Sequence, residues 1–316
     1  MKFNIKSVVY LFVLFSFCLL KVGAVSAQER TDEEWLKYQE KLKKFREDSI
    51  KKAQQLKEAN KDAVMKSSVN KGNQFYKRGQ NQEALDAYNK AIELDPGYAK
   101  AYFGKANALK KLRRFDESAD AYLMAIKLDS TERSYYYNLA ILYRSQEKYN
   151  KVIDMNDKVI ALDPGYHKAY YGKAYALNKL NRQQDAVDVL KKVIEVKPDY
   201  DQALYLMANI DIQLGKFDDA VKALQDAIAI KPKDDDNYTL LANAYNQKGD
   251  YANALTAANK ALELKATNAR AAFEAGDACK NLSRKQEAIA FYQKAAKDRR
   301  WRQSAEYEIK MLTEQK

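Results

Sequence analysis

Residues 65–98 read MKSSVNKGNQFYKRGQNQEALDAYNKAIELDPGY, and this stretch sets a period that the following chain keeps. All four prolines of the sequence stand at one place in that period: Pro96, Pro164, Pro198 and Pro232, separated by 68, 34 and 34 residues. A repeat of about 34 residues is typical of stacked helical hairpins, because each unit buries its apolar face only against its neighbours. The period therefore predicts an all-α solenoid.

Three ladders of small residues keep the same spacing. The first is Gly72, Ala106, Ala140, Ala174, Ala208, Ala242 and Gly276. The second is Ala84, Ser118, Val152, Ala186, Ala220, Ala254 and Ala288. The third is Ala91, Ala125, Val159, Val193, Ala227, Ala261 and Ala295. A large residue recurs between the last two ladders, at Tyr88, Tyr122, Leu190, Leu224 and Tyr292. Small residues at helix crossings with bulky residues between them predict one antiparallel helix pair per period.

These positions resemble the tetratricopeptide repeat (TPR). That pattern has a small residue at repeat position 8, an aromatic near 11, Ala at 20, a large residue at 24, Ala at 27 and Pro at 32. The first unit matches it through Gly72, Phe75, Ala84, Tyr88, Ala91 and Pro96. The resemblance implies a right-handed superhelical solenoid of stacked antiparallel helix pairs. It divides the chain into seven repeats: 65–98, 99–132, 133–166, 167–200, 201–234, 235–268 and 269–302.

Local departures from the pattern predict local differences. Asn156 stands where a large apolar residue is expected, so the second helix of the third repeat should pack less tightly. Cys279 takes a position that is aromatic or Leu in five other repeats, at Phe75, Leu109, Tyr143, Leu177 and Tyr245, which favours a buried core residue over a nucleophile. The segments 96–112 and 164–180 are nearly identical, which indicates either a duplicated two-repeat unit or two similar surfaces for one ligand.

The N-terminal residues 1–27 have the pattern of a secretory signal peptide. Lys2 and Lys6 precede an apolar run over residues 8–20, and small residues end at Ala27, where we expect cleavage. Retention of this segment as an anchor is the alternative. Phe17 before Cys18 argues against lipidation. The signal predicts an exported protein, in the periplasm or cell envelope, with secretion as the other outcome.

The chain is basic, with a formal net charge of +12, and residues 1–27 carry three lysines and no acid, so the remainder carries +9 (12 minus 3). This charge suits acidic partners, although a basic helical surface is equally often only solvated. Export makes nucleic acid a poor candidate partner.

Two segments flank the predicted repeats. Residues 28–64 form a charged amphipathic helical extension, with Trp35, Tyr38, Leu42 and Phe45 at spacings of three and four and the weaker Ser49 and Lys52 behind them. This extension is interpreted as a cap on the first repeat, as an arm for self-association or as a spacer. Residues 303–316 are predicted to form a C-terminal capping helix, since Lys310 stands where a further hairpin would need Gly or Ala.

The resemblance also implies where a partner binds, because the first helix of each TPR lines the concave face. Repeat positions 5, 9 and 12 then supply the predicted partner-binding residues: Phe103, Tyr137, Tyr171, Tyr205, Asn73, Asn107, Asn209, Asn243, Tyr175, Asn178, Lys110 and Arg144. Asn side chains match backbone amides, aromatic rings give flat apolar contact, and cations steer acidic segments. This composition predicts an extended, weakly selective protein ligand, with a glycan or cell-wall ligand as the alternative.

Catalysis has no residue pattern to support it, so the chain is expected not to be an enzyme. His167 is the sole histidine, and no second histidine or cysteine stands near it to hold a metal. The run 234–236, three aspartates, is interpreted as helix capping because it lacks the spacing of a calcium loop. No catalytic, metal or cofactor site is therefore predicted. A C-terminal carboxylate clamp is also not supported, since Val69 and Phe103 replace its lysine.

Overall fold

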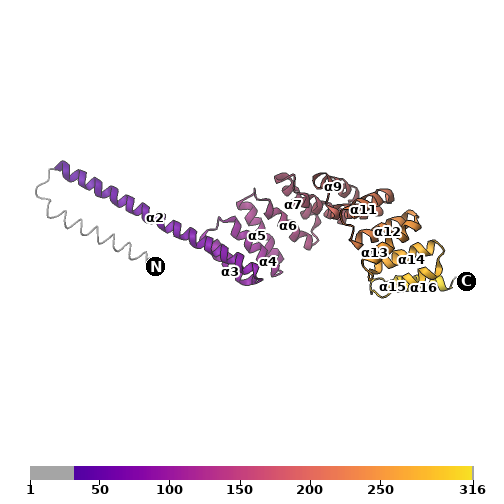
Figure 1. Cartoon of the computed structure of the whole chain (residues 1–316). Helices are drawn as coiled ribbons and strands as arrows, with labels where there is room; N and C mark the ends of the chain where they lie inside the picture. Colours follow the sequence, from indigo (N-terminus) through magenta and orange to yellow (C-terminus); the bar gives the residue numbers. More distant parts are fainter. Residues whose placement is uncertain (1–31, 315–316) are drawn as a thin grey trace.

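The computed structural model describes residues 32–314 of the chain, and the predicted signal peptide lies outside this range. All regular elements in the described range are helices (Figure 1). They are α2 (Asp32–Lys77), α3 (Asn81–Leu94), α4 (Ala99–Lys111), α5 (Phe115–Leu128), α6 (Arg133–Ser145), α7 (Tyr149–Leu162), α8 (His167–Lys179), α9 (Gln183–Val196), α10 (Asp201–Gln213), α11 (Phe217–Ile230), α12 (Asp235–Lys248), α13 (Tyr251–Leu264), α14 (Ala269–Asn281), α15 (Lys285–Ala295) and α16 (Arg302–Glu314).

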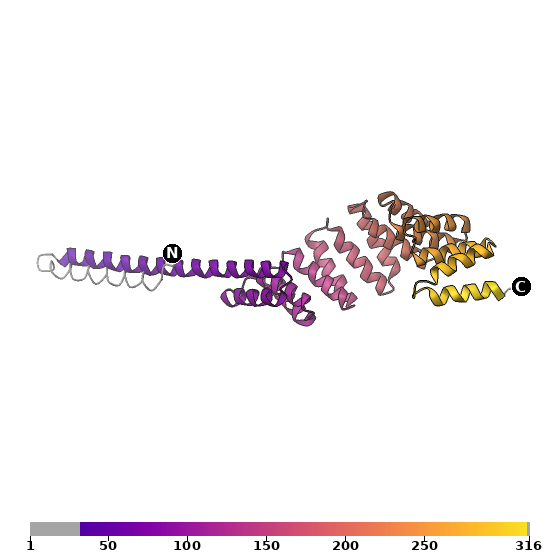
Figure 2. The same ribbon diagram turned by 60° about the horizontal axis from the view of Figure 1, so that its bottom comes forward.

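The helices stack in pairs into a superhelical solenoid (Figures 1 and 2). Each first helix packs most extensively against the second helix that follows it, as α4 does with α5 and α12 with α13. The first helices α4, α6, α8, α10, α12 and α14 begin at residues 99, 133, 167, 201, 235 and 269. These are also the first residues of six predicted repeats. The all-α solenoid expected from the period is confirmed.

Small residues set the distance between the helices. The members of the two second-helix ladders are each at most 1% exposed. In the first pair, the ring of Tyr88 lies between Gly72 and Gly104, and a Cβ on Gly72 would meet that ring at 2.6 Å. A Cβ on Gly104 would come closer still. Glycine is required at both places because the aromatic ring fills the space of their side chains.

A residue with a left-handed backbone conformation follows the first helix of every pair. Gly79, Gly215 and Gly249 have φ between 74° and 85°. The equivalent place is held by non-glycine residues with φ between 56° and 61°, namely Arg113, Glu147, Asn181 and Ser283. This conformation lets the backbone reverse within a short turn, but it costs energy in residues that carry a Cβ.

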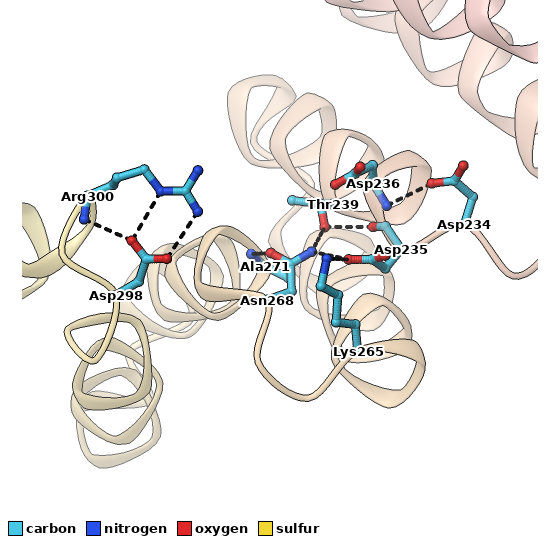
Figure 3. Close-up of polar contacts among 9 residues, drawn as sticks. All are labelled: Asp234, Asp235, Asp236, Thr239, Lys265, Asn268, Ala271, Asp298 and Arg300. Atoms are coloured by element: carbon cyan, nitrogen blue, oxygen red, sulfur yellow. Dashed lines mark hydrogen bonds and ion pairs between the residues drawn. The ribbon is translucent and has the colours of Figure 1, made fainter. Parts of the chain in front are cut away.

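Polar side chains fasten the turns between pairs (Figure 3). The Asn268 Nδ2 donates to Asp235 Oδ2 at 2.7 Å and to Thr239 Oγ1 at 2.9 Å, while its Oδ1 caps α14 at the Ala271 N–H. Asp234 caps α12 by accepting from the Asp236 N–H at 3.1 Å. The expectation that these aspartates cap helices holds for Asp234, whereas Asp235 links α12 to the next turn.

The N-terminal helix does not fold back on the solenoid. α2 is one continuous helix of 46 residues, about 70 Å long at 1.5 Å per residue, and only its C-terminal part pairs with α3. Its outer part projects away from the superhelix, and Leu56 there is 59% exposed (Figure 1). The interpretation of this segment as a cap on the first repeat is therefore wrong. No helix in residues 32–314 is long and apolar enough to cross a membrane.

The opposite end of the solenoid is closed by α16. Its Ala305 and Leu312 are buried against the last helix pair, with Ile309 and Trp301 packed beside them. The ring of Trp301 lies 4.9 Å from the ring of Phe273 on α14. This helix covers the apolar face that a further repeat would otherwise cover, as the ends of solenoids require.

Candidate functional site

The predicted binding residues lie on first helices, which form the inner face of the solenoid. Neighbouring first helices contact one another directly, as α6 does with α8 and α12 with α14. This closeness places them on the inside of the curve, because elements on the inner side of a bend approach more closely than those outside. The inner groove is therefore the candidate functional site.

Most of the predicted asparagines are already engaged within the protein. Tyr88 Oη donates to Asn73 Oδ1 and Tyr122 Oη donates to Asn107 Oδ1, each at 2.7 Å. Asn243 Nδ2 donates to Glu274 at 3.0 Å. One polar group of each amide therefore holds the two helices of a pair, or two neighbouring first helices, together. That these amides contact a ligand backbone stays a prediction.

Asn209 and Asn178 differ from this group in their surroundings. Asn209 Oδ1 accepts from Gln213 Nε2 at 2.9 Å, a bond between two residues on the same helix face. Asn178 lies half-buried on α8. Neither amide forms a hydrogen bond to another helix in the described structure, so a ligand in the groove can reach both positions.

The predicted aromatic row divides into core and groove. Phe103 packs against Tyr122 and Tyr135, with ring centroids 5.9 and 5.0 Å apart, and so belongs to the core. Tyr205 is likewise packed against a core cluster in the C-terminal half. Both rings are half-buried, so part of each is used for packing, and their role as ligand contacts stays a prediction.

Tyrosines of the middle pairs instead line the groove. Tyr137 meets Tyr166 edge-on at 5.1 Å, and Tyr171 meets Tyr200 edge-on at 5.5 Å. Burial raises the pKa of Tyr137 and Tyr171, and that of Tyr200 to about 12, so their hydroxyls are neutral donors at physiological pH. Edge-to-face pairs hold the rings at fixed angles, which gives the groove a rigid aromatic wall.

A cavity of about 240 Å³ opens between α6, α7 and α8. Tyr137, Ile141 and Arg144 of α6 line one side, and Lys168, Tyr171 and Gly172 of α8 line the other. Asn156 of α7 forms its inner wall together with Val152. Asn156 itself is closely packed, since a Cβ on Gly172 would meet its amide at 3.0 Å. The looser packing expected for the second helix of this repeat stays a prediction.

Asn156 is a polar residue in a core position. It is 1% exposed, and its Nδ2 donates to the Val152 carbonyl at 2.8 Å. Its Oδ1 has no hydrogen-bond partner in the described structure. A buried acceptor left without a donor costs about 1–3 kcal/mol, so this atom lowers the stability of the pair α6–α7.

Cations around the groove lack acidic partners. Lys110, Arg144 and Lys168 form no ion pair among residues 32–314, whereas Lys173 and Arg182 nearby are paired with Asp157 and Asp185. Arg144 lies 5.6 Å above the Tyr175 ring, and Lys110 lies 5.8 Å above that of Tyr122. Burial and the neighbouring Lys111 lower the pKa of Lys110. An anionic ligand would relieve this unbalanced positive charge.

Sequence reasoning passed over a buried acid on α10. Asp211 stands on α10 at the position that is apolar or aromatic in the other repeats, and it is 3% exposed. Burial and the nearby Asp219 raise its pKa to about 6. The sequence contains a signal for Asp211, because Leu109 and Leu177 stand at the same position of the 34-residue repeat.

Residues expected to be inert are also found in structural roles. Cys279 is fully buried in the last core cluster, as its repeat position predicts. His167 packs edge-on against Tyr200 at 5.0 Å, and burial with the nearby Lys197 lowers its pKa. No cluster of metal-ligating side chains occurs within residues 32–314.

Stacked helix pairs around a rigid groove define a helical-repeat binding protein. Models of the family described as TPR repeat or tetratricopeptide repeat match residues 72–113, 99–132, 182–244 and 239–305. The chain belongs to the tetratricopeptide repeat proteins. No curated protein sequence matches it.

Solved structures give the same fold. A TPR protein from Parabacteroides merdae has a TM-score of 0.58 at 17% identity, over 79% of this chain and 99% of that one. YrrB, described as a TPR protein with an unusual peptide-binding site, gives 0.51 at 23%, over 59% and 96%. MamA gives 0.51 at 26%, over 54% and 94%. The repeats and these neighbours support a scaffold for protein–protein interaction, and the TPR fold is typically non-catalytic.

Proposed function

We propose that this protein is a non-catalytic scaffold that binds extended acidic protein segments in the inner groove of its superhelix. The observation that carries the proposal is the set of groove cations, Lys110, Arg144 and Lys168, without an acidic partner among the described residues. Rigid tyrosines beside them supply apolar contact at little cost in side-chain entropy. The predicted signal peptide and basic charge suit a place in the bacterial cell envelope, which is part of the same proposal.

Charge reversal in the groove tests this function. Arg144 and Lys168 are exposed and hold no helix in place, so the variant Arg144→Glu with Lys168→Glu should keep its fold. We expect it to lose most of its affinity for an acidic extended peptide such as acetyl-Glu-Gly-Tyr-Gly-Glu-amide. Attraction to rim cations also weakens with salt, so binding by the unaltered protein should fall between low and high ionic strength.

A matched control separates groove charge from overall charge. Lys158 and Lys222 are exposed on the second helices α7 and α11, on the outer side. The variant Lys158→Glu with Lys222→Glu changes the net charge by the same amount, and it should bind the peptide like the unaltered protein. Equal losses in both variants would contradict a groove site.

Self-association through α2 is a second candidate function, favoured by the apolar side chains that its projecting part exposes. Trp35 and Phe45 are 41% and 46% exposed, and with Tyr38 and Leu42 they follow the three-and-four spacing of a coiled coil. In an antiparallel pair centred between residues 43 and 44, Leu42 packs in the apolar seam against Phe45 of the second copy. Beside the seam, Lys41 then lies near Asp48 of that copy, which brings opposite charges together. In a parallel pair Lys41 would lie near Arg46, which brings like charges together.

Sedimentation equilibrium tests this second candidate. The variant Leu42→Asp with Phe45→Asp should be monomeric at concentrations where the unaltered protein forms dimers. Lys44→Asp makes the same change in net charge on another face of α2 and should leave the dimer intact. A monomeric unaltered protein would exclude self-association and leave α2 as a spacer.

A further inference from the structure

We propose that the inner groove binds a charge-asymmetric protein segment in one direction, with the acidic stretch of the partner across α4, α6 and α8 and an uncharged stretch across α10, α12 and α14. The inference rests on the proposed function and adds the charge pattern of the partner and the place of its acidic part. Its basis is the unequal distribution of charge between the two halves of the solenoid.

The first helices of the N-terminal half carry positive charge alone. Helices α4, α6 and α8 contain nine lysines and arginines and no Asp or Glu. The second helices of the same pairs, α5, α7 and α9, contain eight acids and five cations. Positive charge is thus gathered on the first helices of this half, which the net charge of the chain does not require.

Most of these nine cations lack an acidic partner. Arg133 forms an ion pair with Asp163, and Lys173 forms one with Asp157. The other seven form no ion pair among residues 32–314. A carboxylate from outside the chain is therefore the group that can balance them.

The unpaired cations also lie close to one another. Arg144 and Lys179 each lie 5.6 Å from the centre of the Tyr175 ring. Like charges held near one ring repel each other, so an acidic side chain that meets both relieves this repulsion. Burial and the neighbouring Lys111 lower the pKa of Lys110, and a carboxylate nearby would reverse that shift.

The C-terminal half of the groove has the opposite balance. Helices α10, α12 and α14 contain six acids and three cations. Two of these cations are already paired, Lys248 with Asp218 at 2.5 Å and Lys280 with Glu308 at 2.8 Å. Little positive charge is therefore left for an acidic ligand in this half.

The third cation of the C-terminal half, Arg270, is opposed by an acid. Burial raises the pKa of Tyr205, while Arg270 lowers it and Asp236 raises it, so the two charges act on one hydroxyl with opposite sign. An acidic side chain placed there would meet the exposed Asp236 as well as Arg270. An uncharged stretch of the partner avoids that repulsion.

One repeat position shows the contrast between the halves residue by residue. Lys111 of α4 and Lys179 of α8 are exposed at the thirteenth position of their repeats, which Ser145 takes in α6. Gln213 of α10 and Gln247 of α12 are exposed at the same position. Between α8 and α10 this position thus changes from a cation to a neutral amide.

The spacing of the helices sets the length of the acidic stretch. Neighbouring helices pack about 8–10 Å apart, so α4, α6 and α8 cover about 20 Å of the groove. An extended chain advances about 3.3 Å per residue, so about six residues cross this distance. An acid further along the segment would lie over the C-terminal half.

Titration calorimetry with two peptides of one composition tests the charge pattern. The block peptide, acetyl-Glu-Gly-Glu-Tyr-Glu-Gly-Ser-Gln-Tyr-Gly-Gln-Ser-amide, has all its acids at one end. The dispersed peptide, acetyl-Glu-Gly-Ser-Tyr-Gln-Glu-Gly-Tyr-Ser-Gln-Glu-Gly-amide, spreads them over its length. At about 0.1 M salt, where the Debye length is about 10 Å, we expect the block peptide to bind about three- to tenfold more tightly.

Two double variants that lower the net charge by the same amount test where the acids bind. Lys111→Gln with Lys179→Gln removes cations from the N-terminal half, and Gln213→Glu with Gln247→Glu adds acids to the C-terminal half. The first should weaken binding of the block peptide by about three- to tenfold, and the second by less than about twofold. All four side chains are exposed, so both variants should melt like the unaltered protein.

Photo-crosslinking from the peptide tests the direction of binding. A benzophenone amino acid replaces either the first or the second tyrosine of the block peptide, and mass spectrometry identifies the linked fragments. The first tyrosine position, among the acids, should crosslink to residues 99–179, which hold α4 to α8. The second should crosslink to residues 201–281, which hold α10 to α14.

Three results would each overturn the inference: equal affinity for the two peptides, equal weakening by the two double variants, or crosslinks from the first tyrosine position to residues 201–281. If Arg144→Glu with Lys168→Glu still weakens binding of both peptides, the scaffold function stands and only the directional binding is excluded. If neither peptide binds at its solubility limit, the inference and the proposed function both fail.

Discussion

Asn156 occupies, in the pair α6–α7, the place that Tyr88 occupies in the pair α2–α3, and its amide packs against Gly172 as the Tyr88 ring packs against Gly104. Tyr88 lies between two glycines and donates its hydroxyl to Asn73. Asn156 keeps one of those glycines, as Gly172, and a Cβ there would meet the Asn156 amide at 3.0 Å. A polar side chain therefore takes a core position that a ring takes in the first pair, and its Oδ1 is left without a hydrogen-bond partner in the described structure.

The stability of Asn156 variants tests this comparison without any ligand. Asn156→Leu removes a buried, unsatisfied oxygen and introduces the residue found at Leu190 and Leu224 in the next two pairs. We expect the free energy of unfolding to rise by about 1–2 kcal/mol, measured by urea unfolding. Asn107→Leu is the control, because it leaves the Tyr122 hydroxyl without its acceptor and should destabilise the protein. Destabilisation by Asn156→Leu would show that the amide holds the fold together.

The left-handed turns predict a second stability effect. Glu147 has φ of 56° and Gly215 has φ of 74° at equivalent places. Glu147→Gly removes the steric cost of a Cβ in this conformation and should stabilise the protein by up to about 1 kcal/mol. Gly215→Ala should destabilise it by a similar amount, although no atom lies within 4 Å of the added Cβ. Thermal unfolding of both variants checks the pair, and a loss of stability in Glu147→Gly would contradict the explanation.

Asp211 predicts a pH dependence of stability. Its folded-state pKa of about 6 lies above the ordinary value of 3.8, so the favourable contribution of its protonated form is complete below pH 4 and is lost as pH rises through 6. Asp211→Leu should therefore stabilise the protein more at pH 7.5 than at pH 4.5, by about 2 kcal/mol. Melting temperatures at the two pH values measure this difference. Asp226→Leu, on the exposed face of α11, is the control and should show no such gain; equal gains for Asp211→Leu at both pH values would refute the assignment.

The hydroxyls of Tyr292 and Tyr88, at equivalent positions of two repeats, are expected to contribute unequally to stability. Tyr292 Oη donates to Asp277 Oδ1 at 2.6 Å, whereas Tyr88 Oη donates to the neutral Asn73. Hydrogen bonds to charged groups contribute about 1.5–3 kcal/mol and neutral ones about 0.5–1.5 kcal/mol. Tyr292→Phe should therefore lower the free energy of unfolding more than Tyr88→Phe. Equal losses in denaturant unfolding would indicate that Asp277 is protonated, since burial raises its pKa.

The architecture was predictable because its determinants repeat. The same position of each 34-residue repeat requires a small side chain, and Ala84, Ala186 and Ala288 are all fully buried there. The expected capping helix is also found, with its Ala305 and Leu312 buried against the last helix pair. Because the pattern recurs along the chain, a local exception does not hide it, and the fold could be predicted from the sequence.

The candidate site was less accessible, because its residues depend on contacts between repeats. Asn73 looked like a ligand contact until its bond to Tyr88 was seen, and Phe103 looked exposed although two tyrosines cover it. Asn156 was noticed as a defect in packing, but its role in a cavity depends on Gly172 of the next pair. Such contacts depend on distances between neighbouring helices, and the alignment of repeat positions does not give those distances.

Photo-crosslinking gives the most direct test of the central claim that the inner groove holds extended protein segments. A benzophenone amino acid would replace Tyr175, which lies between Arg144 and Lys179 in the groove, or Lys158 on the outer side. The proposed function predicts crosslinks to acidic segments of partner proteins from position 175 and not from position 158. Crosslinks from position 158 alone, or equally from both, would contradict a groove-binding scaffold.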